Sequence, residues 1–296
     1  MSFVTYAQNF EDLMLWRAVK DVRSGFYIDL GAADPELNSV TKAFYDRGWS
    51  GVNIEPGSRP FAKLVSDRPR DININAAIWS DSSKRKIYLV GDDNELTTFD
   101  PYHAANHQRA GFEVREHEIQ TVALRDICSE HVNNRDIHFL KIDVEGSEVD
   151  ALRGHDFTRW RPWIIVIESH EPERISRHWE EADNLILSAK YDFVYCDGLN
   201  RFYTSVERTA QLRPSFEVPP NIYDNWVKAS EVAMQKRAEF AEDGRAEAWK
   251  ALAEAQSQVQ HVREYAKNLE QKLSETQETI RTIYVHLKQK GNPFAE

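Results

Sequence analysis

The chain has 296 residues, of which 41% are hydrophobic, and a formal net charge of −11 at neutral pH. This length is enough for one α/β domain with a buried core and an additional segment. An acidic chain repels phosphate backbones, which argues against a nucleic-acid partner, and no apolar run approaches the ~20 residues that a membrane-spanning helix needs.

Charge and composition divide the chain into two regions. Residues 226–296 hold equal numbers of basic and acidic residues, so the net negative charge lies upstream. Prolines cluster before this change, and we expect one domain over 1–222 and a helical region over 223–296. The N-terminus lacks the basic start of a signal peptide, and Cys128 and Cys196 form neither a metal-binding nor a disulfide pattern. A cytoplasmic protein is therefore expected.

The first region alternates strand-like and helix-like segments. The hydrophobic pattern predicts helices over 10–19, 39–47, 59–67, 122–131, 148–153 and 176–190, and strands over 25–30, 51–55, 72–79, 86–90, 137–144, 163–168, 192–196 and 201–206. Such alternation predicts a Rossmann-like, seven-stranded and mostly parallel sheet with helices on both faces. Asp197-Gly198 predicts a terminal antiparallel hairpin. Residues 92–120 form a polar insertion without a clear period, and long loops of this kind often act as lids.

The last region has the pattern of a coiled coil. Its apolar positions recur at alternating steps of three and four residues from Leu252 to Leu287, through about five heptads. The alternative is a long helix packed on its own domain, but the narrow seam favours self-association. We expect a parallel homo-oligomer, either a dimer or a trimer.

Polar residues follow the first predicted strand at Asp29-Leu-Gly31-Ala32-Ala-Asp34. A glycine at this point allows a tight turn and close approach of a ligand. Asn38 and Ser39 can cap the following helix. The stretch is not G-x-G-x-x-G, so a pyrophosphate cradle is poorly supported, whereas carboxylates suit a cationic ligand.

Acidic residues follow three further strands. Glu55 ends the second strand, where a carboxylate typically accepts hydrogen bonds from ribose hydroxyls. Asp143 and Glu145 end the strand over 137–144, and Glu168 and His170 follow the strand over 163–168. Because the carboxyl ends of parallel strands share one edge of a sheet, one cleft is expected there.

Five stretches in this order resemble the FkbM methyltransferase family. They are YAQNFED at 6–12, FYIDLGA at 26–32, GVNIEP at 51–56, NAAI at 75–78 and KIDVEGSE at 141–148. The resemblance covers about residues 3–210. It implies a class I methyltransferase fold and transfer of a methyl group from S-adenosylmethionine to a hydroxyl, often on a sugar, a polysaccharide or a natural product.

The resemblance also implies roles for individual residues. Asp29, Gly31 and Asp34 would surround the methionine part of the cofactor, Glu55 would hold the ribose, and Asp143 would lie under the sulfonium. Gln8 would belong to a segment that closes over the cofactor. The full set expected at the cofactor is Gln8, Asp29, Gly31, Ala32, Asp34, Asn38, Ser39, Glu55, Asn75, Ala76 and Asp143, with Asn75 and Ala76 near adenine. Gly31-Ala32-Ala33 stands in place of the G-x-G of many methyltransferases.

The family pattern does not fix the catalytic base. His170 has an unperturbed pKa near working pH, and Glu145, Glu168 and Asp143 are the other candidates. The clustered acids make a divalent metal conceivable, but a metal-free site is favoured.

A catalytic head with a coiled coil resembles methyltransferases that cap cell-surface polysaccharides. This resemblance implies a glycan as the acceptor and a glycosyltransferase as a partner, which could hold the protein at the inner membrane. The alternatives are a natural-product acceptor and a catalytically inactive scaffold. An NAD-dependent enzyme is disfavoured by the missing glycine motif, and a protein or RNA methyltransferase by the absence of an N-P-P-Y or D-P-P-Y type motif.

Overall fold

The computed structural model describes residues 2–91, 97–169 and 179–289. The chain forms two compact units, Met1–Ser230 and Glu231–Glu296. Within the described residues, no helix is both long enough and apolar enough to cross a membrane.

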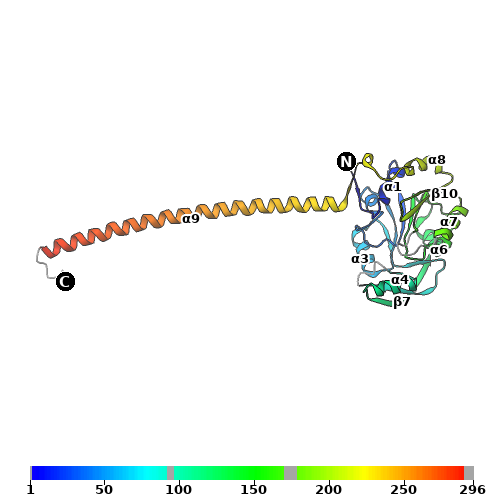
Figure 1. Cartoon of the computed structure of the whole chain (residues 1–296), viewed down its shortest axis with the longest axis horizontal. Coiled ribbons are helices and arrows are strands. Elements are labelled where there is room, and N and C mark those ends of the chain that lie inside the picture. Colours follow the sequence, from blue (N-terminus) through cyan, green and yellow to red (C-terminus); the bar gives the residue numbers. More distant parts are fainter. Residues whose placement is uncertain (1, 92–96, 170–178, 290–296) are drawn as a thin grey trace. The chain divides into compact units, whose positions relative to one another are not determined.

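The first unit is built around a mixed seven-stranded sheet (Figure 1). Six of its strands run parallel to one another, and β11 (Asn200–Ser205) is antiparallel to both of its neighbours. The prediction of an α/β fold is confirmed, and the hairpin expected around Asp197-Gly198 is present, with its second strand reversed between two parallel strands. The order across the sheet is β10 (Tyr191–Cys196), β11 (Asn200–Ser205), β9 (Ile164–Glu168), β8 (Phe139–Ile142), β2 (Phe26–Leu30), β3 (Ser50–Ile54) and β4 (Ile72–Ile74).

Apolar side chains cover both faces of this sheet, as expected for parallel strands between helices. Alternate residues of β2 serve the two faces: Ile28 packs in one cluster and Tyr27 in the other. One cluster includes residues of the helices α5 (Leu124–Ile127), α6 (Glu148–Arg153) and α7 (Trp179–Ser188). The other includes residues of α1 (Glu11–Val19), α2 (Lys42–Tyr45) and α8 (Thr209–Leu212). The first unit also contains the helices α3 (Ser58–Asp67), η1 (Cys128–Val132), η2 (Arg213–Phe216) and η3 (Ile222–Asp224).

A small second sheet corrects two of the predictions. The strand expected over 72–79 is two strands, because the chain leaves the central sheet after β4 and β5 (Ala77–Trp79) joins β7 (Val114–Ala123) instead. Residues 97–120 are not a long loop: β7 also pairs with β6 (Lys84–Val90), and α4 (Pro101–Arg109) precedes it. The strand expected over 86–90 is confirmed as part of β6. Its partner β7 was not predicted, because its charged residues form ion pairs with Lys84 and Lys86 on an exposed face.

The first unit extends beyond residue 222, because a short strand there pairs with one near the N-terminus. The strand β1 (Phe3–Thr5) pairs in parallel with β12 (Trp226–Lys228), and the rings of Phe10 and Trp226 lie 4.7 Å apart. The first unit therefore runs to Ser230, past the predicted boundary at 222. Strands this short carry too little pattern to be recognised in a sequence.

The second unit consists, within the described residues, of one continuous helix. This helix, α9, spans Ala229–Gln289 and has 61 residues, none of which is buried (Figure 1).

Candidate functional site

The turn after β2 lies against the ends of two neighbouring strands, β3 and β8. Gly31 has a φ of +73°, and a Cβ atom there would lie 1.8 Å from the carbonyl oxygen of Asp143. The backbone N–H groups of Gly31 and Ala32 donate to the carbonyl of Ile54 at 3.0 and 3.2 Å. A side chain at position 31 would therefore separate the ends of β2 and β8, which explains the glycine.

Glu55 lies directly after β3 and is buried. Its two carboxylate oxygens accept hydrogen bonds from the backbone N–H groups of Ala33 at 2.9 Å and Gly57 at 2.6 Å. Burial raises the pKa of this carboxyl to about 7, although these hydrogen bonds act in the opposite direction. Because each carboxylate oxygen has two lone pairs, both can still accept from a ligand hydroxyl.

Lys141, on β8, joins two of the predicted acids. Its Nζ lies 3.4 Å from Asp29 and 3.2 Å from Asp143, and donates to the carbonyl of Gly31 at 2.9 Å. Burial disfavours the charge on Lys141, but the carboxylates of Asp143 and Asp29 outweigh it and raise the lysine pKa. Asp29 is fully buried and also accepts from the hydroxyl of Thr41 at 3.1 Å. Lys141 thus neutralises Asp29, and Asp143 lines the cleft that these strand ends form.

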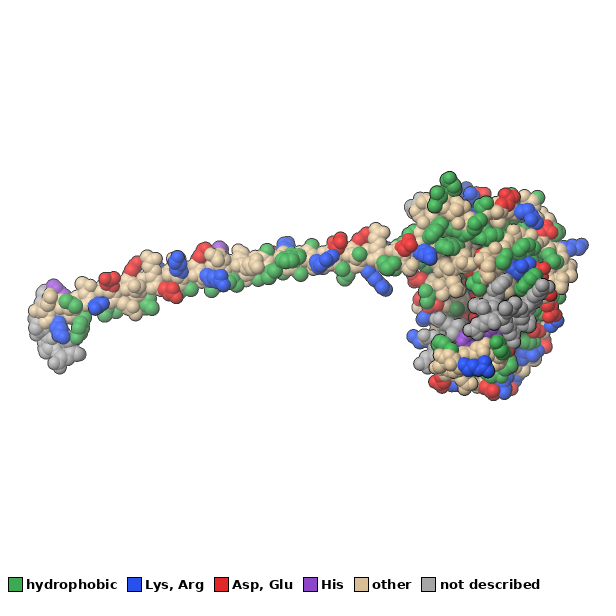
Figure 2. Space-filling model, viewed as in Figure 1, with side chains coloured by type: hydrophobic (Ala, Val, Ile, Leu, Met, Phe, Trp, Pro, Cys, Tyr) green, Lys and Arg blue, Asp and Glu red, His purple; other side chains and the backbone are tan. Residues whose placement is uncertain are grey.

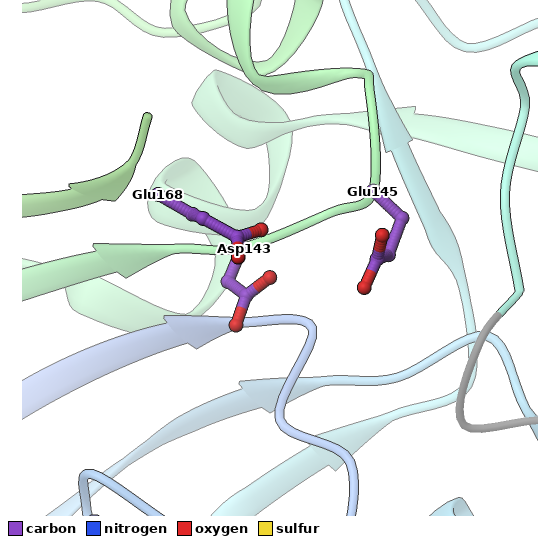
Figure 3. A group of neighbouring side chains, drawn as sticks. All are labelled: Asp143, Glu145 and Glu168. Atoms are coloured by element: carbon purple, nitrogen blue, oxygen red, sulfur yellow. The ribbon is translucent and has the colours of Figure 1, made fainter. Parts of the chain in front are cut away.

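Three carboxylates converge at the ends of β8 and β9. Asp143, Glu145 and Glu168 each place an oxygen within 4.8 Å of the others (Figure 3). Burial, followed by the charges of Asp143 and Glu145, raises the pKa of Glu168 to about 10. Burial, followed by the charges of Asp143 and Glu148, raises the pKa of Glu145 to about 7. Like charges this close do not all ionise, so the group holds a proton on Glu168 at neutral pH.

The loop that carries Glu145 has an unusual backbone conformation, which hydrogen bonds to its backbone groups stabilise. The φ of Glu145 is +49°, which is unusual for a residue other than glycine. The hydroxyl of Thr98 donates to the Glu145 carbonyl at 2.7 Å, while Glu148 accepts from the N–H groups of Val144 and Gly146 at 3.2 and 3.1 Å. These contacts fix the loop that aims the Glu145 carboxyl toward Asp143 and Glu168 (Figure 3). Three oxygen ligands at this spacing also suit a divalent cation.

One cleft, open to solvent, lies at these strand ends; its cavity volume is about 90 Å³, and the space it shares with solvent is about 600 Å³. Gly31, Glu55, Asp143 and Glu145 line it, as the shared sheet edge predicts. Its other wall is apolar. Of this wall only Ala76 was among the residues expected at the cofactor, because much of the wall comes from the small second sheet and its loops. The residues of this wall are Ile54, Ala76, Ile78, Ile87, Val144 and Phe99.

The polar insertion over 92–120 contains the aromatic residues Phe99, Tyr102 and Phe112, and of these Phe99 lines the cleft. The ring of Phe99 lies 5.0 Å from that of Trp79, edge to face, whereas Tyr102 and Phe112 are exposed. For Ile87, the alternation of charged and apolar residues in β6 could have indicated an inward-facing side chain.

Several predicted residues support the site rather than line it. Asp34 accepts from the N–H groups of Glu36 and Leu37, both at 2.9 Å, and pairs with Lys63. These contacts outweigh burial and lower the Asp34 pKa. Asn75 donates to the carbonyls of Glu55 and Pro56 at 2.9 and 3.1 Å, which shapes the turn after Glu55.

The other predicted residues lie as follows. Ser39 is buried and accepts from the N–H of Lys42 at 3.2 Å, and Ala32 is buried beside Ile54. Gln8 and Asn38 are exposed and, among the described residues, do not line the cleft. His170 falls outside the described residues.

Comparison with known proteins assigns the chain that forms this cleft to a family. The model of the methyltransferase FkbM domain matches residues 29–195, more than half of the chain. The chain belongs to the FkbM methyltransferase family.

Two relatives can be compared with this FkbM family member. Methyltransferase 1 of Beauveria bassiana (strain ARSEF 2860) is 27% identical over 140 residues, which are 45% of this chain and 47% of that protein. The match thus spans about half of the relative's length. The crystal structure of methyltransferase FkbM from Methylobacillus flagellatus KT is 14% identical, with a TM-score of 0.39 over 62% of this chain and 44% of that chain.

The FkbM match runs from Asp29, on β2, into β10. It therefore includes every residue that lines the cleft and the whole of the small second sheet. The helix α9 lies outside it.

Proposed function

We propose that the chain is an S-adenosylmethionine-dependent O-methyltransferase that acts on a sugar hydroxyl of a glycan, such as a cell-surface polysaccharide whose growth it caps. One observation carries the proposal. A single cleft is lined by a buried ribose-type acceptor, Glu55, by an apolar wall suited to a purine, and by the acids that follow β8, Asp143 and Glu145. Family membership supports the same chemistry.

The residues present fit S-adenosylmethionine. The apolar wall around Ile78 and Phe99 suits the flat face of adenine. Glu55 has lone pairs for two ribose hydroxyls. Asp143, which faces the same cleft, offers a negative charge to a cationic group. When bound, this cofactor supplies a methyl group activated by a positively charged sulfur.

The side chains of the protein then position the acceptor and move its proton. Glu145 has a pKa of about 7, so a useful fraction is ionised at neutral pH and can accept the proton of a hydroxyl. Glu168, protonated at that pH, keeps the group from carrying three charges. The main contribution is positioning of the acceptor oxygen at near-attack distance.

Three features support a glycan as the acceptor. The cleft is open to solvent, so it can admit a bulky chain end. The negative charge of the chain disfavours nucleic acid. An oligomer formed through α9 would bind a repetitive polymer with avidity and could dock a glycosyltransferase. A natural-product hydroxyl is the second candidate, because the same cleft would admit a small molecule.

The experiment is a calorimetric titration with S-adenosylmethionine and, separately, with NAD. We expect micromolar binding of S-adenosylmethionine, lost in Asp29→Ala and in Glu55→Ala while circular dichroism shows a folded protein. Methyl transfer from labelled cofactor to a panel of glycans and natural products then identifies the acceptor class. No binding by a folded protein would favour an inactive scaffold, and binding of NAD alone would favour a dehydrogenase.

A further inference from the structure

The helix α9 carries an apolar seam along its length. The seam is Leu252, Ala255, Val259, Val262, Ala266, Leu269, Leu273, Thr276, Ile280, Ile283 and Leu287. Its larger side chains are all exposed, among them Val262 at 67% and Ile280 at 61%. Figure 2 shows such hydrophobic side chains along the helix, with charged ones between them. A solitary helix does not keep such a seam in water, because helical stability in proteins comes mostly from packing an apolar face.

When the seam is written as heptads abcdefg, position a is occupied by Leu252, Val259, Ala266, Leu273, Ile280 and Leu287. The d positions are Ala255, Val262, Leu269, Thr276 and Ile283, and Ala248 occupies the d position just before the seam. In a parallel pair, each position meets its own copy. Ala248, Ala255, Ala266 and Thr276 would then form four layers with too little volume, while Leu273 and Ile283 would form large ones.

The positions that flank the seam also give a parallel pair little support. In that arrangement g residues meet e residues five positions further along the second helix. Gln258 would face Arg263, Tyr265 would face Glu270, and Lys272 would face Gln277. None of these is a pair of opposite charges.

An antiparallel pair matches the same residues much better. With a two-fold axis between Lys267 and Asn268, each a position meets a d position of the second copy. Every alanine then faces a large residue, which fills the layers evenly. The layers are Ala266 with Leu269, Ala255 with Ile280, Ala248 with Leu287, Val262 with Leu273, Val259 with Thr276, and Leu252 with Ile283.

The flanking residues select this same register. Arg263 faces Glu270 of the second copy, and the symmetry repeats this ion pair. Trp249 meets Tyr284, and Lys272 meets the ring of Tyr265, which suits a cation–π contact. A shift by one heptad in one direction would place Arg263 against its own copy, and a shift in the other direction would do so for Glu270. Both alternatives juxtapose like charges.

We propose that α9 pairs with α9 of a second copy of this chain as an antiparallel coiled coil, with the axis between Lys267 and Asn268. This arrangement replaces the parallel one expected from the seam alone. Residues 248 and 287 then lie opposite each other, whereas each is 39 positions, or about 58 Å at 1.5 Å per residue, from its own copy.

Disulfide trapping tests the orientation in the full-length chain. Cysteine 196 is replaced by serine, and Ala248→Cys and Leu287→Cys are made separately in this background; Cys128 is buried and stays. Each protein is oxidised alone and after the two have been mixed and allowed to exchange subunits. We expect a covalent dimer only in the mixture. Efficient trapping of either protein alone would establish the parallel arrangement, and a monomeric wild-type chain in light scattering would overturn pairing altogether.

Charge reversal tests the register independently. Arg263→Glu or Glu270→Arg alone should weaken the dimer about tenfold or more, because two ion pairs become two like-charge contacts, and the double variant should restore it. Arg281→Glu and Glu264→Arg make the same changes of charge on the outer face of the helix and serve as controls. Equal effects at inner and outer positions, or no restoration in the double variant, would refute this register.

Discussion

A Cβ atom on Gly31 would lie 1.8 Å from the carbonyl oxygen of Asp143. The contact involves backbone that cannot rotate away, and the glycine also has a φ of +73°. We therefore expect Gly31→Ala to lower the free energy of unfolding by more than about 3 kcal/mol and to abolish binding of S-adenosylmethionine.

Gly48 provides the matched control for this substitution. Its φ is +87°, and nothing lies within 4 Å of a Cβ atom there. Gly48→Ala should therefore cost only the left-handed backbone conformation, about 1 kcal/mol, and leave binding intact. Urea unfolding and calorimetry measure both effects, and equal losses in the two variants would show that the contact with Asp143 is unimportant.

Removal of Lys141 should leave buried Asp29 without its cation. We expect Lys141→Met to lower the free energy of unfolding by about 3 kcal/mol, as for other broken buried pairs, and Asp29→Asn to recover part of that loss in the double variant. Because the folded pKa of Lys141 is raised above 10.5, its contribution is complete at neutral pH and is lost only above pH 10.5. Chemical denaturation at pH 7 measures the free energy of unfolding of each variant. An unchanged midpoint in Lys141→Met would show that Lys141 does not stabilise the fold by pairing with Asp29.

Binding of S-adenosylmethionine should depend on pH through Glu55. The pKa of Glu55 is about 7, and the ionised carboxylate is the stronger acceptor for ribose hydroxyls. Affinity should therefore rise by up to ~10-fold between pH 6 and pH 8, as the ionised fraction rises. Because the folded pKa exceeds the usual 4.5, this group lowers the free energy of unfolding as pH rises from 4.5 to about 7.

Glu55→Gln is the control for that pH dependence, since glutamine keeps the shape of the side chain without titrating. The variant should bind more weakly, with little change in affinity between pH 6 and pH 8. If it retained the wild-type pH dependence, another group would have to be the one that titrates.

Glu145 should matter for turnover more than for cofactor binding. We expect Glu145→Gln to lower kcat by about 100-fold or more, in the range for loss of a general base, with the affinity for S-adenosylmethionine nearly unchanged. Glu118→Gln, on the exposed face of β7, should have no effect. A fall in affinity matching the fall in kcat would assign Glu145 to binding instead.

The same acids give a separate prediction for metal removal. We expect enzyme treated with EDTA to keep full activity, because the proton on Glu168 already relieves the repulsion in the group. Loss of activity that added Mg²⁺ or Mn²⁺ restores would show that Asp143, Glu145 and Glu168 act through a cation.

The sequence predicts the central sheet well because its strands have strong signals. The five residues of β2 are all buried and, apart from Asp29, apolar, and such largely apolar strands between helices are typical of parallel sheets. The acids after β2, β3, β8 and β9 follow from the same rule, since parallel strands end at one edge.

The apolar half of the cleft could not be predicted in the same way. It comes from β5, β6 and the residues around Phe99, and whether these segments face a ligand depends on how β6, β7 and α4 fold back. The split after β4 illustrates the difficulty, because residues 72–79 read as one strand while their two halves pair with different sheets. The strand expected over 86–90 is part of β6, but its partner β7 was not predicted, since the charged residues of β7 look like a solvated segment until they are paired with those of β6.

The pairing of β1 with β12 has a practical consequence for any attempt to produce the first unit (the head, Met1–Ser230) without α9 (the stalk). A shortened protein that ends at residue 222 would lose β12 and Trp226, which packs against Phe10. It would also lose Asp224, the ion-pair partner of Arg17 on α1. Both ends of the head would then fray together, so a poorly behaved fragment of that length would say nothing about the stalk. A fragment that ends at Ser230 keeps these contacts and is the one to crystallise.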